Sequence, residues 1–249
     1  MALYETLLDA YDALFPPNPA TFAFVGPPPA PGAALADVGC ATGGHAFGLA
    51  AAGWRVFGLD TAAPMLAAAR AKAAASRAGV PDPSRPLPEF IEGGMLDVGR
   101  FFAPGSLSAL LCLGNTLPHL RDRDEIRLFL GMAARALVPG GRLVVQVLNY
   151  ARIMGAGIRA LPELGAGPYA FRRSYRDRDD GRLDFMTELA VDGKVQRDST
   201  PLYPVRPAEL ADLAERAGFG SPAMLAGWSG GGFDPASDQV LVLDARLPG

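Results

Sequence analysis

The strongest constraint on this chain is a glycine-rich turn between two short apolar runs that each end in an acid. The first run ends at Asp37 and passes into the turn 39–44, and a helix-like run follows at 46–52. The second apolar run, 55–59, ends at Asp60. Strand, tight turn, helix and strand are typical of a parallel α/β sheet, which binds ligands at the carboxyl ends of its strands. The turn and the two acids therefore predict a ligand site at that edge.

The spacing of the glycines separates two kinds of nucleoside cofactor. Glycine lets the backbone pass close to a ligand, because it has no Cβ and tolerates positive φ. A dinucleotide site usually reads G-x-G-x-x-G, with the middle glycine under the pyrophosphate. From Gly39 this chain reads G-C-A-T-G-G, so Ala41 stands at the middle position. The pattern disfavours a dinucleotide, while the acid Asp60 remains suited to the two hydroxyls of a ribose.

Residues 37–43 resemble motif I of the class I S-adenosylmethionine-dependent methyltransferases, D-x-G-x-G-x-G, in its variant with alanine at the middle position. In that family the loop and the first acid hold the methionine part of the cofactor, and the second acid takes the ribose hydroxyls. The residues after Asp60 resemble the family's D-x-S-x-x-M-L, whose methionine lies against the adenine; a core position is the alternative for Met65. The cofactor-binding residues that the resemblance implies are Asp37, Gly39, Cys40, Ala41, Gly43, Asp60, Thr61, Met65, Met95, Leu96 and Leu113.

The adenine contact departs from the family pattern. Residues 89–97 are expected to form the third strand and its following turn. Relatives carry an acid there, followed by two apolar residues, and that acid accepts from the adenine amino group. This chain has Gly94 followed by Met95 and Leu96. The resemblance then implies one of two arrangements. Either the backbone alone holds the adenine, or Asp97 takes the place of the missing acid from a position further along the chain.

The fourth strand supplies the catalytic candidates. Residues 108–114 are apolar after Ser108, as in a central parallel strand, and lead directly into Asn115. A polar residue at this end of a buried strand points into the cleft. The run C-L-G-N-T-L-P-H-L at 112–120 resembles the L-G-N-S-x-x-H-L of glycine and glycine/sarcosine N-methyltransferases, which makes Asn115 and His119 the candidates. A structural hydrogen bond is the alternative role for His119.

The acceptor side differs from that group at one position. The fifth strand is expected at 142–150, and Asn149-Tyr150 resembles the group's R-N-Y-D-x-I, in which the arginine grips the carboxylate of an amino acid. Leu148 stands at the arginine position, so this clamp is missing. Arg172, Arg173 and Tyr175 are candidates to replace it. The predicted substrate-binding residues are Tyr11, Asn149 and Arg173.

Two segments flank the predicted sheet. Apolar residues at helical spacing in 1–15, stopped by two prolines, predict a helix that resembles the lid of related methyltransferases. Residues 151–205 alternate at period two around short turns, which predicts a small antiparallel cap. The expected organisation is a methyltransferase domain at 1–150 and 206–249, with 1–33 as lid helix and linker, and the cap at 151–205.

Composition excludes several classes of partner. The net charge of −3 offers no electrostatic footprint for nucleic acid or an anionic membrane. The chain starts without a basic n-region and has no run of 18 apolar residues, so neither a signal peptide nor a membrane span is expected. Two cysteines without a C-x-x-C pairing suit a reducing cytoplasm and buried positions. We find no clustered metal ligands, and the sequence leaves the oligomeric state open.

The resemblance implies a doubly wound α/β fold with a seven-stranded, mostly parallel sheet and an antiparallel cap inserted after the fifth strand. The implied reaction transfers the methyl of S-adenosylmethionine to a small-molecule acceptor, with S-adenosylhomocysteine as product. An amine is the favoured acceptor, because a neutral amine needs no dedicated base. The alternatives are a small-molecule O-methyltransferase, a non-catalytic S-adenosylmethionine-binding protein and an NAD-linked oxidoreductase.

Overall fold

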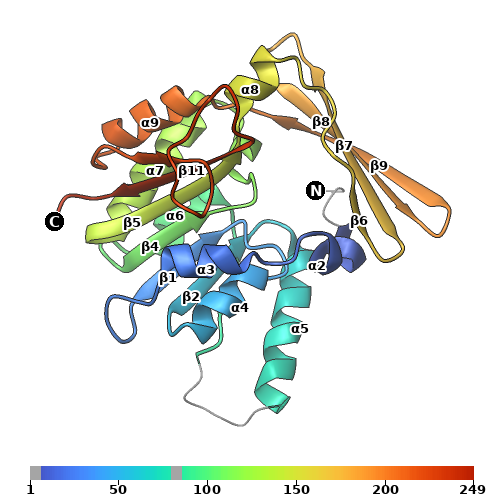
Figure 1. The fold of residues 1–249 in the computed structure, drawn as a ribbon. Helices are drawn as coiled ribbons and strands as arrows, with labels where there is room; N and C mark the ends of the chain where they lie inside the picture. Colours follow the sequence, from blue (N-terminus) through green and yellow to red (C-terminus); the bar gives the residue numbers. More distant parts are fainter. Residues whose placement is uncertain (1–6, 80–85) are drawn as a thin grey trace.

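Two separate sheets organise the protein, in a computed structural model that describes residues 7–79 and 86–249 (Figure 1). The main sheet has seven strands in the order β10-β11-β5-β4-β1-β2-β3. Its strands are β1 (Ala34–Val38), β2 (Arg55–Asp60), β3 (Glu89–Glu92), β4 (Leu107–Cys112), β5 (Leu137–Leu148), β10 (Ala223–Leu225) and β11 (Val240–Arg246). The neighbours from β3 to β5 run parallel, while β11 runs antiparallel to both β5 and β10. The expected doubly wound, mostly parallel sheet is confirmed.

Helices cover both faces of this sheet. On one face α6 (Val98–Phe101), α7 (Arg123–Ala136) and α9 (Pro207–Arg216) share the largest apolar cluster with the strands. On the other, α3 (Pro19–Val25) and α4 (Gly44–Ala51) pack on β1, β2 and β4, while α5 (Ala63–Gly79) contacts β2 and β3. Central strands buried on both sides explain the continuous apolar run at 109–113. This arrangement brings the carboxyl ends of β1, β2 and β4 to one edge.

The inserted sheet forms a cap with the order β6-β7-β8-β9. Its strands are β6 (Leu164–Ala166), β7 (Tyr169–Asp177), β8 (Leu183–Val191) and β9 (Lys194–Leu202), all antiparallel. The three longer strands follow the predicted alternation. The sequence analysis missed β6 and the helix α8 (Tyr150–Gly155), although Asn149 is a recognisable N-cap whose side chain accepts from the Arg152 amide.

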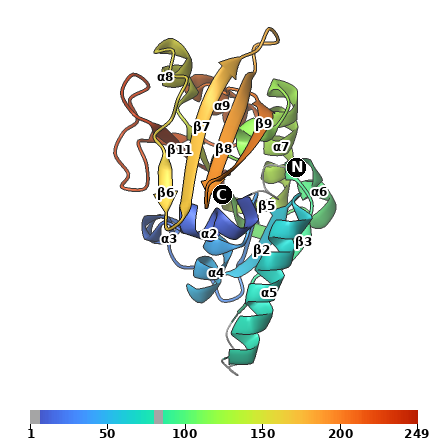
Figure 2. The same cartoon turned by 90° about the vertical axis from the view of Figure 1, so that its right-hand side faces the viewer.

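The N-terminal segment lies against the cap. A 3-10 turn η1 (Leu8–Ala10) leads into the short helix α2 (Tyr11–Leu14), and the first six residues of the helix expected at 1–15 fall outside the described residues. Figure 2 shows α2 below the lower ends of β6 and β7, next to α4. Phe15 contacts Phe171 of β7 edge-on, with ring centroids 5.7 Å apart. The N-terminal segment therefore touches both the main domain and the cap.

The helix α3 was not expected. Asn18 caps it by accepting from the Ala20 amide at 2.9 Å, and Pro19 occupies its first turn. An N-cap asparagine followed by proline is a standard helix start. This helix start was not recognised in the sequence because the helix is short and lies between two proline-rich stretches.

Candidate functional site

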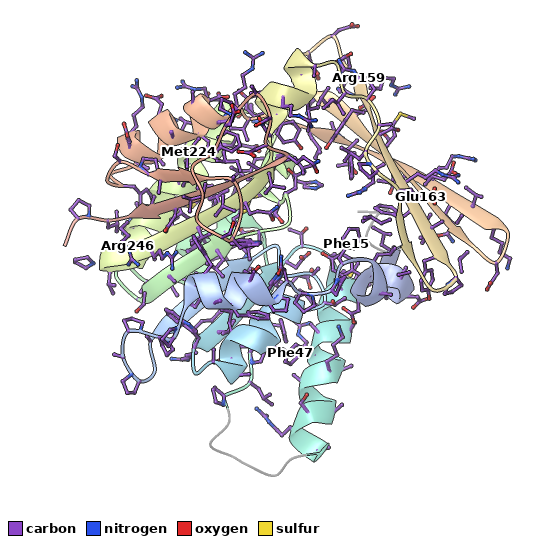
Figure 3. All side chains as sticks on the ribbon, viewed as in Figure 1. Phe15, Phe47, Arg159, Glu163, Met224 and Arg246 are labelled. Atoms are coloured by element: carbon purple, nitrogen blue, oxygen red, sulfur yellow. The ribbon has the colours of Figure 1, made fainter. Side chains whose placement is uncertain are left out.

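A cavity of about 530 Å³ opens at the carboxyl edge of the main sheet. Its walls come from the loop after β1, the ends of β2, β4 and β5, the N-terminal segment and the inner face of the cap. Figure 3 shows Phe15 beside the cap strands and Phe47 on the opposite side of the N-terminal helices. A volume of 300–1,000 Å³ is typical of small-molecule sites.

The glycine loop is held tightly against its neighbours. The amides of Gly39 and Cys40 both donate to the Leu59 carbonyl, at 2.7 and 3.0 Å. Gly39 has φ +81°, and a Cβ there would lie 2.4 Å from the Thr116 side chain in the loop after β4. Ala41 also adopts a positive φ, of 47°. The loop after β1 thus packs so closely on the loop after β4 that only glycine fits at position 39.

Asp60 ties the ends of β1 and β2 together. Its Oδ2 accepts from the Ala41 amide and its Oδ1 from the Ala62 amide, each at 2.8 Å. Burial raises the pKa of this carboxyl above its ordinary value, and the backbone amides oppose that shift. Each carboxylate oxygen has a second lone pair, so Asp60 can still accept from a ligand hydroxyl.

Asp37 is the most perturbed acid of the cavity. It is 2% exposed, and burial, followed by the nearby charge of Asp60, raises its pKa to about 7. Its carboxylate accepts no hydrogen bond from the residues that the structure describes, whereas buried acids are normally paired. A cationic ligand group would supply the missing partner and lower the pKa again.

Asn115 lies where the loop after β4 meets the start of α8. Its Nδ2 donates to the Tyr150 hydroxyl and its Oδ1 accepts from the Leu148 amide, both at 3.0 Å. Its backbone has φ 64°, a conformation that asparagine tolerates better than most residues. These contacts fix the amide at the wall of the cavity, with one hydrogen and one lone pair left over.

Both histidines line the cavity, and burial lowers the pKa of each. The pKa of His119 falls to about 4, so this side chain is neutral at physiological pH. His45 packs against Phe22, with ring centroids 6.0 Å apart. A neutral imidazole with so low a pKa is a weak proton acceptor.

The cap closes the cavity with a largely apolar wall. Phe171 and Arg173 of β7, Phe185 of β8 and Leu161 line it, and Leu148 of β5 faces them. Successive residues of a strand point to opposite faces, so 171 and 173 share the inner face of β7. The cap therefore contributes one cationic side chain, Arg173, to an otherwise apolar wall of the cavity.

A polar contact fastens the N-terminal segment to the rim. Asp12 forms an ion pair with Lys72 of α5 and accepts from the Thr42 hydroxyl at 2.5 Å. The Lys72 ammonium also donates to the Thr42 carbonyl at 3.2 Å. This contact, the Asp12–Lys72 latch, connects α2 to the glycine loop and to α5.

The structure brings most of the predicted site residues to this one cavity. Those that line it are Tyr11, Asp37, Gly39, Cys40, Ala41, Asp60, Thr61, Met95, Leu113, Asn115, His119 and Arg173. The other four predicted residues are not among the lining residues. Met65 is fully buried in the cluster below α2, Leu96 is 40% exposed, and Gly43 starts α4 with φ 83°. Asn149 uses its side chain to cap α8 and to bind the Pro235 and Asp238 carbonyls.

Several lining residues escaped the sequence analysis. Gln146 interrupts the apolar strand β5, and its Oε1 accepts from the Gly114 amide at 2.7 Å. A lone polar residue inside an apolar strand was the available signal. Asp97, considered as a shifted adenine contact, instead accepts from the Gly94 amide at 2.9 Å. A Cβ at Gly94 would approach Thr61 to 3.1 Å, so this position is tight.

Comparison with known proteins identifies the domain. Residues 35–141 match the family model of a methyltransferase domain. The chain contains a methyltransferase domain. Its enzyme class is that of the S-adenosylmethionine-dependent methyltransferases, and its cofactor is S-adenosylmethionine. The match counts against the alternative of an NAD-linked oxidoreductase.

Solved structures share the fold of this chain over nearly its whole length. An S-adenosylmethionine-dependent methyltransferase from Clostridium acetobutylicum aligns over 99% of this chain and 100% of its own, with a TM-score of 0.77 and 12% identity. The CcbJ methyltransferase from Streptomyces caelestis is 25% identical, with a TM-score of 0.73 over 98% of this chain and 96% of its own. CalS10, an amino pentose methyltransferase from Micromonospora echinaspora, is 19% identical, with a TM-score of 0.54 over 98% and 90%. The comparison with curated proteins gives no significant match.

Both cysteines are buried and unpaired by disulfide, as expected. Among residues 7–79 and 86–249, no helix is both long and apolar enough to cross a membrane. Within the same ranges, no three histidine, cysteine or acidic residues gather as metal ligands.

Proposed function

We propose that this methyltransferase transfers the methyl group of S-adenosylmethionine to the nitrogen of a small-molecule amine held beneath the cap. The observation that carries the proposal is the pairing of a cap-covered cavity with a histidine whose pKa is about 4. A hydroxyl acceptor needs a competent base, and His119 is a poor one. An amine needs only to lose its proton before attack, which an apolar site favours by disfavouring the charged form.

The cofactor residues in this proposal are those at the acidic end of the cavity. When bound, S-adenosylmethionine supplies an electrophilic methyl on a positively charged sulfur. Asp60 would accept the ribose hydroxyls with its remaining lone pairs. Asp37 would offer its unpaired, buried carboxylate to the cationic end of the cofactor. The residues fit the cofactor because the orphaned acid gains a partner and the glycine loop permits a close backbone approach.

Asn115 would orient the acceptor. Its amide is fixed by Tyr150 and by the Leu148 backbone, and the free lone pair of Oδ1 suits an N–H of the amine. Holding the amine this way directs its own lone pair toward the reacting methyl. Alignment and exclusion of water supply much of the rate gain in such a displacement. Leu113 beside it, with the phenylalanines of the cap, would exclude water.

We also infer that the acceptor loop belongs nearest to the glycine/sarcosine N-methyltransferase-like group. Residues 112–120 carry the resemblance. Leu148 replaces the arginine that this group uses for the substrate carboxylate, so the acceptor need not be glycine. This assignment agrees with an amine acceptor.

Matched acceptors test the proposal. Labelled S-adenosylmethionine would be incubated with 2-phenylethylamine or 3-methylbutylamine and with the corresponding alcohols, and methylated product would be counted. We expect methylation of the amines, and loss of activity in Asp60→Ala. Methylation of the alcohols alone would contradict the proposal and point to O-methylation.

A further inference from the structure

Arg173 differs from the other arginines between residues 159 and 202. The arginines between residues 159 and 202 are Arg159, Arg172, Arg173, Arg176, Arg178, Arg182 and Arg197. All except Arg173 form an ion pair with an Asp or Glu of the cap region. Within the described residues Arg173 has no carboxylate partner, and it is the one that lines the cavity.

The guanidinium of Arg173 is only partly satisfied. Its Nη2 donates to the Pro162 carbonyl at 2.8 Å, while its Nε is buried with no hydrogen-bond partner among the described residues. The strand partner directly opposite is Thr187, which is buried and uncharged. Leaving a charged donor buried and unpaired is costly, so native proteins rarely do it without a functional reason.

Tyr175, the next residue on this face of β7, does not line the cavity. It lies two residues along β7 and therefore on the same inner face as Arg173. Tyr175 is 4% exposed, and its hydroxyl is buried in the apolar cluster that contains Tyr150. Burial raises the pKa of this hydroxyl, and the neighbouring Tyr150 opposes that shift. Arg173 is therefore the residue of this strand that brings an unsatisfied donor to the cavity lining.

The charges of the cavity indicate which molecule brings that acceptor. Asp37, Asp60 and Asp12 line the end near the glycine loop. Among the described lining residues, Arg173 is the one lysine or arginine, and it comes from the cap. An anion bound by Arg173 is therefore separated from the acidic end that the cofactor's cationic groups would occupy.

We propose that Arg173 binds a carboxylate of the methyl acceptor. The acceptor is then an amine that also carries a carboxylate, with an apolar side chain to match Phe171, Phe185 and Leu161. The planar guanidinium suits a carboxylate because it donates two parallel hydrogen bonds. This inference rests on the proposed amine methylation and specifies the substrate class.

Equilibrium binding tests the subsite without requiring turnover. Protein saturated with S-adenosylhomocysteine would be titrated with L-phenylalanine or L-leucine, and with 2-phenylethylamine or 3-methylbutylamine, which lack the carboxylate. A buried charge-assisted pair predicts that each amino acid binds about 10- to 100-fold more tightly than its amine. Arg173→Gln should bring this ratio close to one.

Arg172→Gln is the matched control, because Arg172 lies next in the chain, is exposed and pairs with Glu163 and Glu188. It should leave the ratio unchanged. Absence of a preference for the amino acids in the unmodified protein would overturn the proposal, as would a preference that survives Arg173→Gln. Weaker S-adenosylhomocysteine binding in Arg173→Gln, with the ratio unchanged, would overturn it in favour of the cofactor's own carboxylate.

Failure of the subsite and failure of the proposed function give different results. If the protein methylates alcohols rather than amines, the turnover assay changes while the carboxylate preference in binding persists. If amines are methylated without regard to a carboxylate, the binding ratio is near one and the proposed function stands alone.

Discussion

Replacing Asp37 with asparagine should stabilise the protein without cofactor. Asp37 is buried near Asp60, without a hydrogen-bond partner among the described residues, and its pKa is raised from 3.8 to about 7. In the unfolded chain the same carboxyl loses its proton near pH 4. Between these values the folded state binds more protons than the unfolded state, so stability falls as pH rises from about 4 to 7.

The magnitude follows from the size of the shift. The pKa rises from 3.8 to about 7, and each pKa unit corresponds to about 1.36 kcal/mol. The ionised carboxylate should therefore lower the free energy of unfolding by on the order of 4 kcal/mol above pH 7. An asparagine side chain at this position cannot ionise and avoids the penalty. Part of this destabilisation is already present at pH 5. The increase in the free energy of unfolding caused by Asp37→Asn should therefore be about 2–3 kcal/mol larger at pH 8 than at pH 5.

Urea unfolding of the two proteins at pH 5 and pH 8 measures this difference. Asp179→Asn, at an exposed turn position, is the control and should change stability little at either pH. Adding S-adenosylhomocysteine at a hundred times its dissociation constant should raise the free energy of unfolding of the unmodified protein by about 2.7 kcal/mol. At the same ligand concentration the Asp37→Asn protein should gain far less, because it lacks the buried anion.

Two results would refute this reasoning. One is an Asp37→Asn protein that is less stable than the parent at pH 8. The other is a difference in stability that does not change with pH. Either would mean that the Asp37 carboxyl is ionised without penalty in the folded protein.

Three further substitutions have defined outcomes. Gly43→Ala should destabilise by at least about 1–2 kcal/mol in urea unfolding, because it combines φ 83° with a Cβ 2.7 Å from the Phe90 ring. Lys72→Met should raise the S-adenosylhomocysteine dissociation rate about 2- to 5-fold at low salt, since the partly exposed pair with Asp12 contributes about 0.2–1 kcal/mol. Asn115→Ala should lower kcat about 100-fold while changing S-adenosylhomocysteine affinity little, as loss of acceptor alignment predicts.

Each of these predictions has a matched control. Gly105 has a similar positive φ, of 64°, but open space where a Cβ would lie. Gly105→Ala therefore measures the destabilisation caused by the backbone conformation without the steric clash. The effect of Lys72→Met should shrink in about 0.5 M salt, and a salt-independent effect would exclude an electrostatic latch. Equal losses of kcat and of cofactor affinity in Asn115→Ala would contradict an acceptor-side role.

The sequence predicted the main sheet well because its signals are local. A glycine turn between two acid-ended apolar runs sets the strand edge, and the buried strand β4 is apolar at every position except Ser108. The antiparallel position of β11 beside β5 is not encoded by any residue pattern in 240–246. Strand order depends on contacts between distant segments, which periodicity does not report.

The site was predictable where a residue lies at the end of a strand. Asp37, Asp60 and Asn115 all follow from that rule and line the cavity. Asn149 satisfies the same rule, yet its side chain caps α8 and binds backbone carbonyls. A polar residue after a strand can serve the next helix as well as a ligand, and the hydrogen bonds decide between the two.

The inner face of the cap could not be predicted from the sequence. Alternation in 169–177 predicted a strand but not which face turns inward. Arg172 and Arg173 are adjacent and chemically identical, and only the packing of Phe171 and Tyr175 selects Arg173 for the cavity. The orientation of a half-buried strand is a property of the assembled protein.

The shared contacts of cap and N-terminal segment have a consequence for exchange between related enzymes. Among the described strands, β6–β9 pair only with one another, so the cap can be replaced without changing the register of the main sheet. Leu7 and Leu14, however, belong to the same apolar cluster as Ala41, Phe171 and Leu189. A cap transplanted from a relative would meet an ill-fitting lid unless the N-terminal segment came with it. The unit of exchange is therefore a pair of segments about 150 residues apart in the sequence, which recombination at a single point cannot move together.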